Sequence, residues 1–165
     1  MSSNLFDMTN KVALITGSSK GIGRAIAEEM VRQGARVVIS SRKADVCQEV
    51  ADAINAEAKV SGNQTGEAIV IPAHVGQREA LQHLVDETRK RLGQIDVLVC
   101  NAAVNPFYGS MQELPDDAMD KILDINIKSN HWLVNMVLPE MIERKDGAII
   151  IVSSVGGLRG SPVLG

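Results

Sequence analysis

Features that would identify several classes of protein are scarce in this chain of 165 residues. The longest uninterrupted apolar run, 148–152, is far shorter than the ~20 residues that a membrane-spanning helix needs. Four aromatic residues are too few and too scattered to form a base-stacking surface. The net charge of −3 also means that basic residues do not outnumber acidic ones, as they do in typical nucleic-acid-binding proteins. We therefore expect neither a membrane protein nor a nucleic-acid-binding protein.

Cysteine is scarce as well, since Cys47 and Cys100 are the only two. They cannot build a disulfide framework, and no CxxC or HxxxH spacing offers a metal site. We expect two reduced, small apolar side chains and no bound metal. The first ten residues, MSSNLFDMTN, contain neither a basic segment nor an apolar run, so they do not resemble a secretion signal. These features predict a location in the cytoplasm, with an organelle matrix as the alternative.

Short apolar runs alternate with longer amphipathic segments along the chain. This alternation predicts an α/β protein: a Rossmann-type, doubly wound parallel sheet with helices on both faces. The apolar runs predict strands at 11–16, 36–40, 68–71, 95–100 and 148–153. Helical spacing predicts helices at 22–33, 44–60, 78–92 and 116–144, and we expect Pro139 to kink the last helix or to end its main body. Without a repeat or a linker, residues 1–165 are expected to form one domain.

The first predicted strand leads into the segment 16–23, TGSSKGIG, and a helix follows at once. In such a turn Gly17 permits the tight bend, Gly21 lets the backbone approach a pyrophosphate, and Gly23 allows close contact between helix and strand. The first N–H groups of the helix and the positive end of its dipole then attract the anion. The spacing is neither G-x-G-x-x-G nor a loop ending in GK[ST]. It nevertheless predicts a phosphate-binding turn.

The TGxxxGIG pattern resembles that of the short-chain dehydrogenase/reductase family. Further family elements follow in order: Asn101-Ala102-Ala103 after the fourth strand, Asn126 in the long helix, and Val152-Ser153-Ser154 after the fifth strand. The resemblance runs from Lys11 to the end of the sequence. It implies the strand order 3-2-1-4-5 and an oxidoreductase that interconverts an alcohol and a ketone or aldehyde by hydride transfer.

The end of the second strand bears on the choice of cofactor. An NAD enzyme places a carboxylate ~20 residues after the glycine loop, where it binds the ribose 2′-hydroxyl. Ser41 stands there instead, followed by Arg42 and Lys43, and Lys20 adds a cation within the glycine loop. A 2′-phosphate attracts such cations. The alternative is that they are solvated charges at a helix start, where cations are mildly unfavourable. We therefore favour NADP(H) over NAD(H).

Two positions depart from the family pattern. His74-Val75 replaces an Asp-Val pair whose aspartate contacts adenine, so His74 stacks, donates a hydrogen bond or is simply a surface residue. Ala103 replaces a glycine, which ordinary backbone angles would tolerate. Together with Asn105-Pro106, these changes resemble the NADPH-dependent carbonyl and retinal reductase branch. The predicted cofactor-binding residues are Gly17, Ser19, Lys20, Gly21, Ile22, Gly23, Ser41, Arg42, Lys43, His74, Val75, Asn101, Ala102 and Ala103.

The resemblance implies that Ser154 orients the carbonyl and that Asn126 anchors a water in a proton relay. The alternatives are a turn-capping hydroxyl for Ser154 and a buried, backbone-bonded amide for Asn126. The family's Tyr-x-x-x-Lys pair is absent, and its tyrosine would fall about 13 residues after the serine, beyond residue 165. The only tyrosine, Tyr108, has Gln112 four residues later and is expected to face the substrate or to pack.

Three explanations remain for the missing pair. The sequence stops short of the whole protein, it is a naturally truncated product, or it is an isolated half; an uncovered apolar strand at 148–152 favours the first. The domain is thus expected to be incomplete at its C-terminus. The resemblance also implies a homodimer or homotetramer joined through the long helix and the helix after it. Two rival functions are a non-catalytic NADP-binding or regulatory protein and an S-adenosylmethionine-dependent methyltransferase, which needs no basic residue for a 2′-phosphate.

Overall fold

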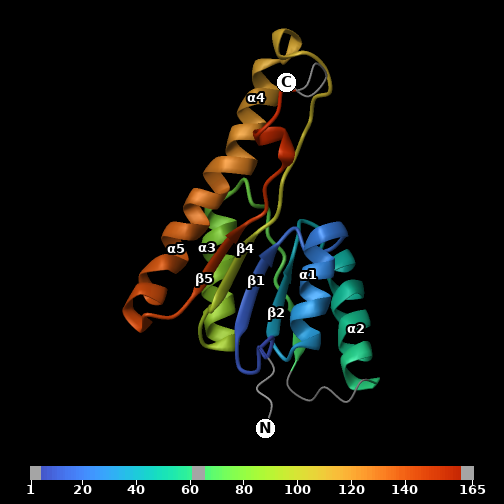
Figure 1. The fold of residues 1–165 in the computed structure, drawn as a ribbon, viewed down its shortest axis with the longest axis vertical. Coiled ribbons are helices and arrows are strands. Elements are labelled where there is room, and N and C mark those ends of the chain that lie inside the picture. The colour runs from blue at the N-terminus through green and yellow to red at the C-terminus, as the bar shows by residue number, and fades with distance from the viewer. Residues whose placement is uncertain (1–4, 61–65, 161–165) are drawn as a thin grey trace.

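A parallel sheet forms the centre of the computed structural model, which describes residues 5–60 and 66–160 (Figure 1). Its strands are β1 (Val12–Thr16), β2 (Arg36–Ser40), β3 (Glu67–Val70), β4 (Val97–Cys100) and β5 (Ala148–Ile151). They lie in the order β3-β2-β1-β4-β5, and every neighbouring pair is parallel. The predicted Rossmann-type fold and strand order are confirmed. Because the order reverses beside β1, a crevice for a ligand is expected at the carboxyl ends of β1 and β4.

Helices cover both faces of the sheet. On one face α1 (Gly21–Arg32) and α2 (Ala44–Val60) pack against Val37 and Ile39 of β2. On the other face α3 (Arg78–Leu92) and α5 (Ser129–Arg144) enclose a second apolar cluster, which includes Val38. Successive strand residues thus enter opposite cores, as in a parallel sheet covered on both sides. The helix and strand bounds agree with the sequence patterns to within one or two residues, except in the region 116–144.

That region is divided. Before α5 come α4 (Asp116–Leu123) and a π-helical segment, Asp124–Lys128, and a short 3₁₀ turn, Met111–Glu113, precedes α4. The expectation that Pro139 ends the main body of the helix is wrong, because α5 continues through it to Arg144. A proline removes one N–H and crowds the carbonyl four residues earlier. Both Pro139 and Asn135 are exposed, so solvent can accommodate that carbonyl.

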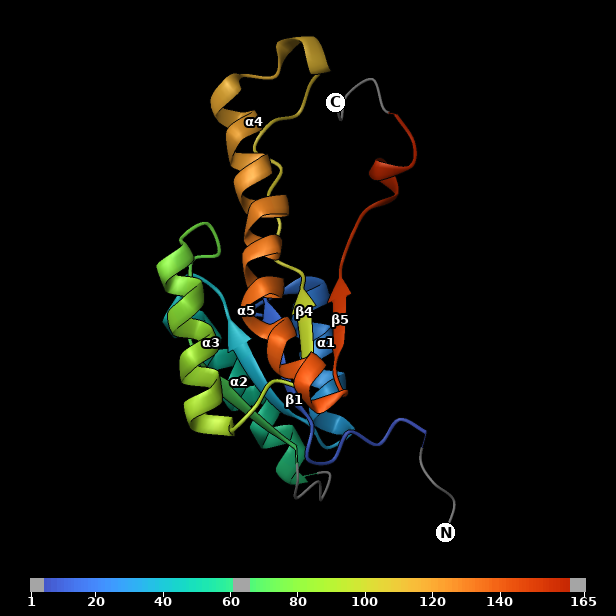
Figure 2. The same cartoon turned by 90° about the vertical axis from the view of Figure 1, so that its left-hand side faces the viewer.

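Two regions of the structure are exposed: the rod formed by α4 and α5, and the edge strand β5. The rod of α4 and α5 projects beyond the carboxyl ends of the strands in both views (Figures 1 and 2). Among the described strands, β5 pairs only with β4, and its Ile150 and Ile151 are 44% and 57% exposed. The apolar edge expected at this strand is therefore observed. No helix within residues 5–60 and 66–160 is long and apolar enough to span a bilayer.

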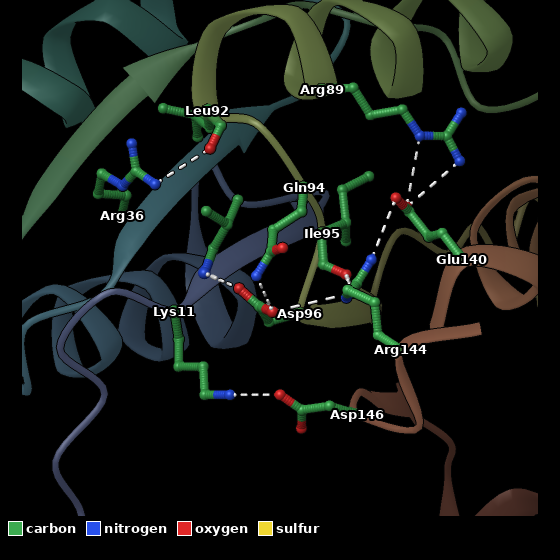
Figure 3. A network of polar contacts seen from close by, with 11 residues as sticks. Lys11, Arg36, Arg89, Leu92, Gln94, Ile95, Asp96, Glu140, Arg144 and Asp146 are labelled. Carbon is green, nitrogen blue, oxygen red and sulfur yellow. Dashed lines mark hydrogen bonds and ion pairs between the residues drawn. The ribbon is translucent and has the colours of Figure 1, made fainter. Parts of the chain in front are cut away.

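The amino ends of β1 and β4 are fixed by a buried polar network (Figure 3). Asp96 is 2% exposed and accepts hydrogen bonds from the Val12 N–H at 2.8 Å and from Gln94 Nε2 at 2.7 Å. Its carboxylate also lies 3.8 Å from Arg144, which pairs with Glu140 at 3.3 Å on α5. This network joins the base of the sheet to the last turn of α5. It lies at the opposite end of the strands from the predicted site.

Candidate cofactor and active site

The glycine turn between β1 and α1 is tied to the end of β2. The Ser18 N–H donates to the Ser40 carbonyl at 3.2 Å, and the Ser40 N–H donates to Ser18 Oγ at 2.8 Å. Ser18 Oγ itself donates to the Ile15 carbonyl at 2.8 Å. Gly17 and Gly21 have φ values of +66° and +55°, which side chains other than glycine's rarely adopt. The turn is therefore held in one shape beside β2.

The glycines of this turn have different surroundings. A Cβ at Gly23 would lie 2.4 Å from Asn101 Nδ2 and 2.6 Å from the Gly17 carbonyl oxygen, so no side chain fits. The close contact that Gly23 allows is thus made with the turn and with Asn101, whereas a strand was expected. A Cβ at Gly21 would meet nothing within 4 Å. The start of α1 has no side-chain cap, so its first N–H groups remain available to an anion.

Thr16 and Asn101 join the ends of β1 and β4 across the crevice. Thr16 Oγ1 accepts from the N–H groups of Asn101 and Ala102, both at 3.1 Å. In return Asn101 Nδ2 donates to the carbonyls of Thr16 at 2.9 Å and Gly17 at 3.2 Å. The Asn101 amide donors therefore point into the protein. Its side chain supports the glycine turn, and Thr16, which the sequence analysis did not single out, is the centre of this arrangement.

Residue Cys100, next to Asn101, is not a candidate nucleophile. Both Cys47 and Cys100 are buried and form no disulfide, as predicted. Burial raises the pKa of the Cys100 thiol to about 11. The nucleophilic thiolate is therefore scarce at neutral pH.

Three predicted phosphate ligands surround the turn as exposed cations. Lys20 lies two residues after Ser18, and Arg42 and Lys43 follow the end of β2 to which Ser18 is bonded. None of the three cations forms an ion pair with another residue in the described ranges. Cations at the surface without acidic partners attract a phosphate, and a guanidinium can bind two of its oxygens. Ser19 and Ile22 complete the turn, and Ile22 is 64% exposed.

The segments after β2 and β3 lie side by side. The Ala73 N–H donates to the Ser41 carbonyl at 3.1 Å, which brings His74 and Val75 next to the predicted phosphate ligands. His74 is half-buried, and its Nδ1 accepts from the Gly76 N–H at 3.1 Å. The neutral ring therefore carries its proton on Nε2, which leaves His74 a hydrogen-bond donor. Val75 packs partly buried against the core on the α3 side.

Asn126 lies in the π-helical segment, and its side chain bonds backbone at both ends. Its Oδ1 accepts from the Val104 N–H and its Nδ2 donates to the Val104 carbonyl, both at 2.9 Å. The carbonyl of Asn126 accepts from Asn130 Nδ2 at 2.8 Å, and that of Ile125 accepts from Ser129 Oγ at 2.6 Å. The Asn126 amide thus fixes the loop after β4, and these two bonds leave it one N–H and one oxygen lone pair for a water or a ligand.

Ser154 lies in the segment after β5. Its Oγ accepts from the Gly156 N–H at 3.1 Å and caps a 3₁₀ turn, Val155–Gly157. The turn-capping interpretation therefore describes its contact in this structure. Figure 2 shows this segment standing apart from α4, and among the described residues no hydrogen bond joins Ser154 to Asn126. The Tyr108 side chain is 73% exposed, so it is not packed into the core.

The structure brings most of the predicted residues to the carboxyl edge of the sheet. Hydrogen bonds join the glycine turn to the end of β2 and to Asn101-Ala102, and they join Ser41 to Ala73. The predicted cations are carried by these segments. Ala103 has no positive φ, so the change from glycine is tolerated by the backbone as expected. Sequence reasoning missed Ser129 and Asn130, whose side chains satisfy the π-helical carbonyls. Two small polar residues, three and four positions after Asn126, were the available signal.

Comparisons with known proteins agree with this arrangement. The family model for short chain dehydrogenase matches residues 11–165. Dehydrogenase/reductase SDR family member 4 from Homo sapiens is 43% identical over 156 residues, covering 94% of this chain and 53% of the relative. The Bos taurus protein of the same name is 42% identical over 158 residues, covering 96% and 54%. The chain thus spans about half the length of these curated relatives.

Solved structures show the same similarity. A metagenomic short-chain oxidoreductase in complex with NADP superposes with a TM-score of 0.85 at 31% identity, over 94% of this chain and 67% of that one. An alcohol dehydrogenase from Thermococcus sibiricus, complexed with 5-hydroxy-NADP, gives a TM-score of 0.83 at 25% identity, over 93% and 62%. With its fold, its glycine turn and these matches, the chain belongs to the short-chain dehydrogenase/reductase family of oxidoreductases.

Proposed function

We propose that the protein is an NADP(H)-dependent oxidoreductase that interconverts an alcohol and a ketone or aldehyde. One observation carries the cofactor assignment: a rigid glycine turn with open helix N–H groups lies beside three exposed cations that have no acidic partner among the described residues. The NADP and 5-hydroxy-NADP in the two related crystal structures support this assignment.

In this proposal the pyrophosphate lies over Gly21 and the start of α1, where a Cβ would meet nothing. Arg42, Lys20 and Lys43 bind the 2′-phosphate, and Ser41 donates a hydrogen bond to it. The adenine end extends towards the segment 74–75, and the nicotinamide end towards Ala102 and Ala103. When bound, the nicotinamide supplies or accepts the hydride.

Residues of the chain itself are expected to bind the substrate at the end of the site where its carbonyl oxygen lies. Ser154 donates its hydroxyl hydrogen to the substrate oxygen, since its Oγ so far only accepts a hydrogen bond from Gly156. The backbone carbonyl of Asn126 holds a water of the proton relay, and its amide keeps the loop at Val104 in place. The exposed side chains of Tyr108 and Met111 offer apolar surface to the substrate.

Self-association is part of the proposal. Apolar side chains that are 38% to 65% exposed occur along α4, the π-helical segment and α5, at Met119, Leu123, Ile127, Leu138 and Ile142. Such a row of exposed apolar residues is typical of a protein–protein interface. We expect a homodimer or homotetramer formed through this rod, and light scattering coupled to gel filtration measures it. A monomer at every concentration would contradict this part of the proposal.

Calorimetric titration of NADPH and NADH tests the cofactor assignment. Arg42→Ala is expected to lower the NADPH affinity at least tenfold, or ~1.4 kcal/mol, and to leave the NADH affinity nearly unchanged. Lys59→Ala removes another exposed cation, in the last turn of α2, and serves as the control for net charge. Equal losses for both cofactors would contradict the 2′-phosphate assignment. Binding of neither cofactor to the unaltered protein would refute the proposed function.

A second candidate is a non-catalytic NADP-binding or regulatory protein. Such a protein would bind NADP(H) through the same glycine turn and cations but would transfer no hydride. Saturable NADPH binding without reduction of a panel of ketones and aldehydes would support this candidate. Selective binding of S-adenosylmethionine in the same titration would instead indicate a methyltransferase.

A further inference from the structure

The hydroxyl of Ser41 has a buried partner. Ser41 Oγ lies 3.1 Å from Cys47 Sγ, in the first turn of α2. Cys47 is 0% exposed and belongs to the apolar cluster between α1, α2 and the sheet. Its N–H donates to the Lys43 carbonyl at 3.1 Å, and the Ser41 carbonyl accepts from Ala73 at 3.1 Å. The segment 41–43 is therefore fixed on both sides, with one side of the Ser41 hydroxyl facing the thiol.

This contact has two possible hydrogen-bond directions. A hydroxyl has one hydrogen and two acceptor lone pairs, whereas a thiol is a weak donor and a weak acceptor. If Ser41 donates to Cys47 Sγ, the outer side of its oxygen can only accept. If the Cys47 S–H donates to Ser41 Oγ, the hydroxyl hydrogen is available to a ligand outside. A fully ionised phosphate oxygen only accepts, so a phosphate at Ser41 requires the second direction.

We propose that Cys47 is a positioning residue that directs the Ser41 hydroxyl hydrogen towards the 2′-phosphate of the cofactor. The inference rests on the proposed NADP(H) binding. Cys47 does not touch the ligand itself, because its side chain is fully buried. It acts by holding Ser41 Oγ in one staggered position and by supplying the hydrogen bond that leaves the serine hydrogen free. Arg42 and Lys43 provide the attraction, and the Ser41–Cys47 pair adds a directed donor.

The pair also distinguishes the two cofactors. A ribose 2′-hydroxyl both donates and accepts, so it can bond Ser41 in either hydrogen-bond direction. NADH therefore gains nothing from the Cys47 S–H, and only NADPH depends on it. The ratio of the two affinities is the informative quantity, because both cofactors share all remaining contacts. A general loosening of the fold would weaken both.

The experiment is a double-mutant cycle followed by calorimetric titration with NADPH and NADH. Cys47→Val fills a similar volume but has no hydrogen to donate, and Cys47→Ser retains a donor. Without the Cys47 S–H, the Ser41 hydroxyl hydrogen has three staggered orientations, of which one points at the phosphate, so Cys47→Val is expected to lower the NADPH affinity about threefold. The NADH affinity should stay unchanged, because a 2′-hydroxyl bonds Ser41 in either direction. Ser41→Ala is expected to lower the NADPH affinity at least tenfold, since a hydrogen bond to a charged group is lost.

Three further results belong to the cycle. Cys47→Ser should restore the NADPH affinity, and Cys47→Val should have no additional effect in the Ser41→Ala protein, because the two residues act as one unit. Cys100→Val, at the other buried cysteine, is the matched control and should change neither affinity. If Cys47→Val does not fold, Cys47→Ala is measured instead with the same expected ratio.

The inference is overturned if the Cys47 variants weaken NADPH and NADH equally, leave both unchanged, or act as strongly when Ser41 is already alanine. These results would leave the proposed function intact, provided that the unaltered protein binds NADPH. Binding of neither cofactor by the unaltered protein would overturn both the inference and the proposed function.

Discussion

Alanine at Gly21 should mainly weaken cofactor binding, whereas alanine at Gly23 should mainly destabilise the fold. At Gly21 the added Cβ meets nothing within 4 Å, so its cost is the positive φ of +55°, about 1 kcal/mol. At Gly23 the added Cβ would lie 2.4 Å from Asn101 Nδ2 and 2.6 Å from the Gly17 carbonyl oxygen. Overpacking of this kind costs about 1–3 kcal/mol, and displacing Asn101 weakens two hydrogen bonds worth about 1 kcal/mol each.

We therefore expect Gly23→Ala to lower the free energy of unfolding by about 2–4 kcal/mol. Gly21→Ala should lower it by only about 1 kcal/mol but should reduce the NADPH affinity at least tenfold, because the methyl group stands where the pyrophosphate approaches. Urea denaturation followed by circular dichroism measures stability, and calorimetric titration measures binding.

Gly93 offers a matched control for both measurements. It has a φ of +94° at the end of α3, and a Cβ there would also meet nothing within 4 Å. Gly93→Ala should therefore cost stability without changing the cofactor affinity. If Gly21→Ala binds NADPH as tightly as the unaltered protein, the pyrophosphate does not lie on this turn. A Gly23→Ala protein of normal stability would refute the argument from crowding.

Three further predictions concern the scaffold. Asp96→Ala leaves the buried Val12 N–H without its acceptor and should cost about 3 kcal/mol in urea denaturation; a loss within error would show that the network is not stabilising. Asn126→Ala removes two hydrogen bonds to Val104 and should speed amide hydrogen exchange at that residue; unchanged exchange would contradict its anchoring role. Burial raises the pKa of Cys100 from 9.0 to about 11, so unfolding releases a proton between these values. The free energy of unfolding should therefore keep its full value below pH 9.0 and fall by roughly 2–3 kcal/mol as the pH rises through 11. Cys100→Val should remove this decrease. If the decrease persists in that variant, Cys100 is not its cause.

The long helical region shows where sequence patterns fail. Its apolar spacing is compatible with one continuous helix over 116–144, and nothing in the period marks the π-helical segment Asp124–Lys128. The side chains that satisfy its carbonyls come from the following turn, and Asn126 bonds a loop 22 residues earlier. Of the two effects expected of Pro139, ending the main body of the helix did not occur, because the effect of a proline depends on whether the crowded carbonyl faces solvent or protein.

The candidate site was predictable to a similar extent. The glycine spacing after an apolar strand predicts a turn with positive φ, since only glycine adopts that backbone without strain. The direction of the Asn101 amide, the bond from Gly76 to His74 and the contact of Ser41 with Cys47 were not predictable. Each depends on which polar group the fold places opposite the side chain.

The sequence by itself determined the layered fold, the strand and helix bounds outside the region 116–144, and the position of the glycine turn. These properties follow from apolar periodicity and backbone restrictions, which are local, whereas the strand order was implied by the family resemblance. Only the tertiary structure decided that Asn101 and Asn126 hold backbone, that Ser154 caps a turn, and that Ser41 faces a thiol. Hydrogen-bond partners distant in sequence are chosen by packing, because a buried donor or acceptor must bond whatever the fold places beside it.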